Sequence, residues 1–91
     1  MNPQELAQHR AGLFQEALRR VSDPNSIVNW DWNRRPKEEE FYSYEVALHK
    51  EVLHIEFTAE DVPHLGMNEK KWVEEFMRKV SARAEPPLLT R

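Results

Sequence analysis

The chain has 91 residues, a formal net charge of −3 and no cysteine. This length suits one domain, and the missing thiols exclude disulfides, cysteine nucleophiles and thiolate metal sites. There is no apolar run of the roughly 20 residues that span a membrane, and the N-terminus lacks the features of a secretory signal. We therefore expect a cytoplasmic protein in which residues 1–85 form one domain and residues 86–91 a mobile tail.

The charge is distributed unevenly along the chain. Residues 1–35 carry five arginines against four acids, residues 36–61 two lysines against eight acids, and residues 62–91 six bases against four acids. The central segment therefore has a net charge of −6 between mildly basic flanks, so the chain can pair with itself or present an acidic patch to a basic partner. The same acidity argues against general binding of nucleic acid.

The first expected element is a helix that begins after Asn2. Asn2 can cap the helix, Pro3 suits the first helical position and Glu5 completes a capping box. The turn signal at residues 23–26 ends it, and Arg10 is expected on its solvated side. Large apolar residues at helical spacing predict the buried stripe, which is Leu6, Leu13, Phe14, Ala17, Leu18 and Val21.

Residues 27–32 allow two interpretations. Val28, Trp30 and Trp32 alternate with polar residues, which is typical of a short strand. The alternative is an extended loop whose tryptophans fill the edge of the core.

Residues 41–57 alternate apolar and polar residues on both sides of a break, and so predict a β-hairpin with one buried face. We expect Leu48 opposite Leu53 and a four-residue loop between them, because Lys-Glu lacks the Gly or Asn that a two-residue turn prefers. In that register the buried face consists of Tyr44, Val46, Leu48, Leu53, Ile55 and Phe57.

Two helical segments are expected after the hairpin. Residues 58–61 form a capping box for one short helical turn, which Gly66 ends, and Asn68 caps a second long helix that stops near residues 85–87. The buried stripe of this long helix is Trp72, Val73, Phe76, Met77, Val80 and Ala84.

The order of these elements predicts an α+β fold. A small antiparallel sheet of two to three strands carries an N-terminal and a C-terminal helix on one face, in the order α-(β)-β-β-α. A lone hairpin is marginally stable, so either residues 27–32 add a third strand or a second chain extends the sheet into a homodimer.

The expected register places Glu45 directly opposite Glu56, with His54 beside them. Opposed carboxylates repel, and a bound cation, an arginine or a shared proton could offset the repulsion. These three residues would then serve a small metal-dependent or acid–base enzyme. The alternative, which we favour, is two glutamates that extend into water. We expect no enzyme, no cofactor and no metal site.

Residues 30–35 interleave Trp30, Trp32, Arg34 and Arg35. This composition is used to stack bases and hold phosphates, and tryptophan and arginine also anchor protein interfaces. The tryptophans can equally be core side chains. Phe41 follows three glutamates and is a candidate anchor for a partner at an acidic rim.

The function we expect is that of a small non-enzymatic protein–protein interaction module, such as an adaptor, regulator or inhibitor. Its acidic hairpin surface would bind a basic partner, or the edge of its sheet would pair with another strand, and a homodimer through the sheet is one such arrangement. A metal-dependent or acid–base enzyme is the first alternative, and nucleic-acid binding is the second.

Overall fold

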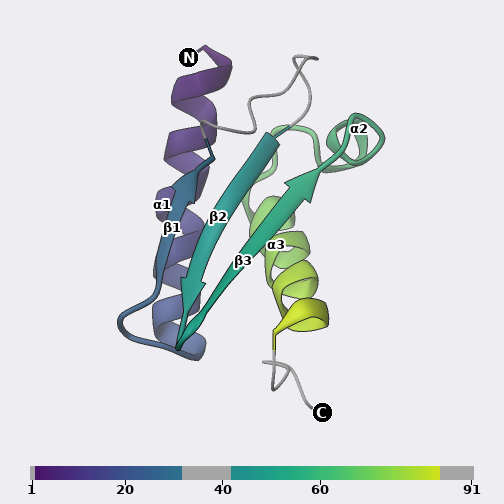
Figure 1. The fold of residues 1–91 in the computed structure, drawn as a ribbon. Helices are drawn as coiled ribbons and strands as arrows, with labels where there is room; N and C mark the ends of the chain where they lie inside the picture. Colours follow the sequence, from purple (N-terminus) through teal and green to yellow (C-terminus); the bar gives the residue numbers. More distant parts are fainter. Residues whose placement is uncertain (1, 32–41, 85–91) are drawn as a thin grey trace.

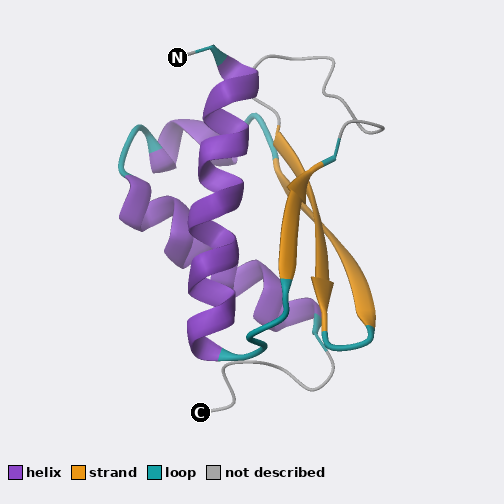
Figure 2. Cartoon of the chain, turned by 90° about the vertical axis from the view of Figure 1, so that its left-hand side faces the viewer, coloured by secondary structure: helices purple, strands orange, loops and turns teal. Residues whose placement is uncertain are grey.

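The computed structural model describes residues 2–31 and 42–84. Its three strands form one antiparallel sheet in the order β1-β2-β3, and the long helices α1 and α3 lie on the same face of that sheet (Figure 2). The elements in chain order are α1 (Pro3–Val21), β1 (Ile27–Trp30), β2 (Tyr42–Leu48), β3 (Glu51–Phe57), α2 (Asp61–Leu65) and α3 (Glu69–Arg83) (Figure 1).

This architecture confirms the α+β class, the two long helices on one face and the third strand. The expected tail at residues 86–91 lies outside the described residues. Among the helices that are described, none has the length and the apolar character of a membrane span.

The ends of α1 form as the sequence predicts. The Asn2 side chain accepts a hydrogen bond from the Glu5 N–H, and the Glu5 carboxylate accepts one from the Asn2 N–H. Pro3 is the first helical residue, where its missing N–H costs nothing. At the other end the Ser22 N–H donates to the Leu18 carbonyl over 2.8 Å and closes the last turn.

The buried face of α1 is rotated away from the predicted stripe. Leu6 and Leu13 are only half-buried, Val21 is exposed, and the expectation of a solvated Arg10 is wrong. Because α1 packs against both β1 and α3, small side chains that permit close approach are buried in place of leucines. The buried residues of the helix are Ala7, Arg10, Ala11, Phe14 and Leu18.

The hairpin turn is shorter than expected. Val46 pairs with Leu53 and Leu48 pairs with Glu51, so the loop contains two residues instead of four. The first of them, His49, has a φ of 56°, a left-handed conformation that favours glycine. The register moves by two positions, which keeps every side chain on its expected face. Five of the six predicted inner residues are buried and Leu53 is half-buried.

Of the two helices after the hairpin, α3 begins at its predicted cap, whereas α2 begins at Asp61, after an N-cap Glu60 that makes no side-chain hydrogen bond. The Thr58 and Asp61 side chains accept each other's backbone N–H groups ahead of α2, and Gly66 ends this helix with a φ of 57°. Asn68 caps α3 by accepting the Lys71 N–H. The predicted stripe of α3 is confirmed, with Val73 half-buried and five residues buried, namely Trp72, Phe76, Met77, Val80 and Ala84.

Phe14 is the central side chain of the core. Its ring stacks on Phe76 of α3 with 4.1 Å between the centroids, and meets Tyr44 of β2 edge-on at 5.1 Å. Phe57 of β3 lies at 5.8 Å. All four side chains are fully buried, so one residue of α1 connects the second long helix to both strands of the hairpin.

Replacement of Phe14 by alanine should therefore destabilise the whole fold. We expect a loss of about 3–5 kcal/mol in the free energy of unfolding, measured by urea denaturation, because a cavity opens between the layers. Leu13→Ala, on the half-buried neighbour, is the matched control and should lose much less. Equal losses in the two variants would contradict this description of the core.

Candidate functional site

The face of the sheet that is turned away from α1 and α3 is the candidate functional site (Figure 2). Strand register arranges its side chains in three rows, each with one residue from every strand or its extension. The first row is Ile27, Ala47 and Val52, the second is Asn29, Glu45 and His54, and the third is Asp31, Ser43 and Glu56.

The first row is an exposed apolar stripe. Ile27 is 44% exposed and Val52 is 59% exposed, and Ala47 between them is exposed as well. Glu45, in the next row on the same strand as Ala47, is also exposed. We call these four residues the outer patch.

The third row, in contrast, is not open surface. Ser43 is fully buried and Asp31 is nearly so, although both belong to the outward face by register. The accessible part of this face is therefore the end near the hairpin turn.

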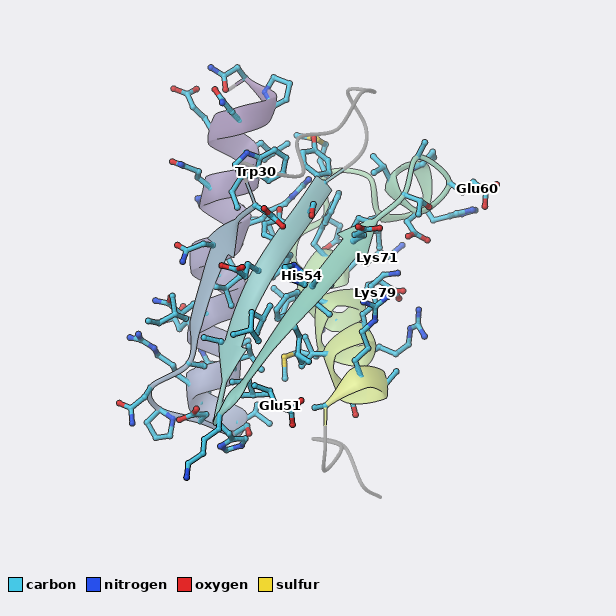
Figure 3. The ribbon with its side chains drawn as sticks, viewed as in Figure 1. Trp30, Glu51, His54, Glu60, Lys71 and Lys79 are labelled. Atoms are coloured by element: carbon cyan, nitrogen blue, oxygen red, sulfur yellow. The ribbon has the colours of Figure 1, made fainter. Side chains whose placement is uncertain are left out.

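The predicted opposition of two glutamates is wrong. Because the turn is two residues shorter, Glu45 lies opposite His54, and Glu56 lies opposite Ser43. His54 sits in the middle of the outward face (Figure 3), with its Nδ1 3.4 Å from the Asp31 Oδ2. An imidazole beside carboxylates produces no repulsion that a cation must offset.

The argument for a metal site at Glu45, Glu56 and His54 loses its basis with that register. Within residues 2–31 and 42–84, no three or more His, Asp or Glu side chains are grouped so that they could hold a metal ion.

Of the aromatic and basic candidates, only Trp30 is in the described part of the chain. It is buried, with its ring edge-on to Tyr42 and Tyr44 at centroid distances of 5.8 and 5.9 Å. Trp30 is thus a core side chain, which was one of its three interpretations. The other candidates lie outside the described residues, and they are Trp32, Arg34, Arg35 and Phe41.

A serine, a histidine and an aspartate meet at the hairpin turn, and sequence reasoning missed them. Ser22 Oγ lies 3.3 Å from His49 Nε2, and His49 Nδ1 lies 3.7 Å from Asp23 Oδ2. Asp23 also accepts the backbone N–H of His49 over 2.7 Å. His49 is 27 residues from Ser22 and 26 residues from Asp23 in the sequence, so no local motif indicates the cluster.

Acyl transfer by such a set also needs donors for an oxyanion. The N–H groups of Ser22 and Asp23 both donate to the Leu18 carbonyl instead. The carbonyl end of α1 moreover repels developing negative charge. We conclude that Asp23 holds His49 in its left-handed conformation and so stabilises the turn.

Arg10 is the second feature that sequence reasoning missed. It is 2% exposed, and its guanidinium carbon lies 3.4 Å from the centroid of the Trp72 ring. The Gly66 carbonyl accepts two hydrogen bonds. One comes from Arg10 Nη2, at 3.4 Å, and the other from the indole N–H of Trp72, at 2.8 Å. Burial lowers the pKa of Arg10. Its spacing from Ala7 and Phe14 was the available signal, because it places Arg10 on the buried side.

Comparison with known proteins identifies no relative: no protein-family model, no curated protein and no solved structure matches the chain. Its function must be argued from its own surfaces.

Arg10 provides a test of how a buried cation is tolerated. Its buried Nε has no hydrogen-bond partner among the described residues. We expect Arg10→Met to be at least as stable as the wild type, whereas Arg10→Ala, which leaves a cavity beside Trp72, should lose about 2–3 kcal/mol. Urea denaturation followed by tryptophan fluorescence measures both, and equal destabilisation would contradict the prediction.

Asp23 provides a test of the hairpin turn through pH. The N–H groups of Asn25 and His49 hold the pKa of the Asp23 carboxyl below its usual value. A lowered folded-state pKa means that the carboxylate stabilises the fold above the unfolded-state pKa, and that this stabilisation is lost as the pH falls through the folded-state pKa.

The stability difference between the wild type and Asp23→Asn should therefore be largest at neutral pH and shrink below about pH 4. Thermal denaturation of both proteins across this range measures it. A difference that does not change with pH would show that the charge of Asp23 has no role.

Proposed function

We propose that this protein is a small protein–protein interaction module that binds a basic partner on the outer patch. The observation that carries the proposal is the apolar row of Ile27, Ala47 and Val52, which is exposed on a face that no described helix covers. Contiguous exposed apolar side chains are typical of binding surfaces, whereas scattered ones are not.

Charge supports a basic partner. Residues 36–61 have a net charge of −6, and Glu45 stands beside the apolar row. A complementary surface would place an aliphatic or aromatic side chain between Ile27 and Val52, and a lysine or arginine against Glu45. The acidic segment would also speed the encounter with such a partner.

A second copy of the chain is the other possible occupant. In a homodimer through this face the two acidic surfaces would approach each other, and their repulsion favours a different, basic protein. We also propose the cytoplasm as the compartment, since a chain without cysteine suits a reducing environment.

The test is affinity capture from the native host with two damaging variants and two matched controls. Val52→Lys and Glu45→Lys should each reduce capture of a basic protein about tenfold or more. Met67→Lys and Glu74→Lys place a lysine at exposed positions outside the patch and outside the acidic segment, and should capture as the wild type does.

Capture that survives Val52→Lys, or that falls equally in Met67→Lys, would overturn the proposal. Light scattering over a concentration series separates the two occupants. A dimer that Val52→Lys converts to a monomer would identify a second copy in place of a basic partner.

A further inference from the structure

A groove between α1 and β1 is a second surface, separate from the outer patch. It has a volume of about 350 Å³, and none of the described residues that line it is charged. Trp30 stands at one end of β1 beside it (Figure 3). Its lining includes Gln8, Gly12 and Gln15 from α1, and Val28, Asn29 and Trp30 from β1.

β1 is an edge strand of the sheet. The Asp31 N–H, just beyond the strand, donates to the Ser43 carbonyl of β2 over 2.9 Å. Backbone alternation therefore directs the N–H groups of Val28 and Trp30 away from β2, toward the groove. At the opposite edge, Arg83 of α3 donates to the His54 carbonyl.

Gln15 occupies the edge of β1. Its Oε1 accepts the Val28 N–H over 3.1 Å, in the position that a carbonyl of a fourth strand would take. A side-chain carboxamide has the same acceptor and donor groups as a backbone peptide. The edge thus already holds a substitute for a peptide group.

Gly12 keeps the helix side of the groove open. Glycine inside a helix costs about 1 kcal/mol relative to alanine. A Cβ at this position would meet no atom within 4 Å, so packing does not require glycine here. Position 12 therefore contributes no side chain to the groove, and a large side chain there would extend into open space.

We propose that this groove binds an extended, uncharged peptide segment, which pairs with β1 as a fourth strand and displaces the Gln15 carboxamide. The carboxamides of Gln8 and Asn29 can donate to and accept from a peptide backbone or an uncharged polar side chain. A charged residue of the peptide would find no counter-charge among the lining side chains of residues 2–31 and 42–84.

The competing explanation is that Gln15 permanently covers the edge and prevents strand addition. A titration of the full ¹⁵N-labelled chain with the acetylated, amidated peptide Thr-Val-Ser-Val-Thr-Val separates the two. Binding should shift the backbone amide of Val28 and the side-chain amide of Gln15 in a saturable way. The same peptide with proline in place of its second valine should not bind, because proline has no N–H to donate.

Two variants at Gly12 locate the site. Gly12→Phe fills the groove and should weaken binding about tenfold or more, whereas Gly12→Ala should bind as the wild type does. Val52→Lys, on the outer patch, should leave peptide binding unchanged. The result for the groove is therefore independent of the result for the proposed function. If Gly12→Phe does not fold, the proline peptide still decides the question.

The proposal is overturned by any of three results. These are no shift in the wild type at millimolar peptide, equal binding of the proline peptide, or equal binding by a folded Gly12→Phe.

Discussion

Phe14 projects from α1 into the space between the sheet and α3, where its ring stacks on Phe76 and meets Tyr44 edge-on. Because these rings are fully buried, the contact attaches both long helices to the same face of the sheet. No described helix covers the opposite face, and the end of it near the hairpin turn is exposed. The position of the outer patch is thus a consequence of how the core forms.

The hairpin turn determines which side chains share that outward face. A two-residue turn places Ala47 between Ile27 and Val52, and places Glu45 opposite His54. The turn requires a left-handed His49, which is costly for a residue other than glycine. Asp23 accepts the His49 N–H and holds this conformation from the end of α1. A carboxylate outside the sheet therefore supports the register on which the outer patch depends.

Arg10 shows a similar dependence between distant parts of the chain. Its guanidinium covers the Trp72 ring and shares the Gly66 carbonyl with the indole N–H, so it joins α1 to the connection between α2 and α3. Contacts with the Trp72 and Tyr42 rings and a 3.4 Å hydrogen bond to the Gly66 carbonyl compensate only in part for the loss of water around a cation. This junction combines tight packing with an incompletely satisfied polar group.

Local patterns in the sequence determined the caps at Asn2 and Asn68, the apolar stripe of α3 and the alternation of the hairpin, because each depends on residues within a few positions. The class of fold followed from their order. Tertiary structure alone decided the register, the burial of Arg10 and the meeting of Ser22 with His49, since each depends on neighbours far away in the chain. The outer patch depends on both the local pattern and the tertiary structure. Alternation indicated which side chains face outward, but only the pairing of three strands placed Ile27, Ala47 and Val52 in one row.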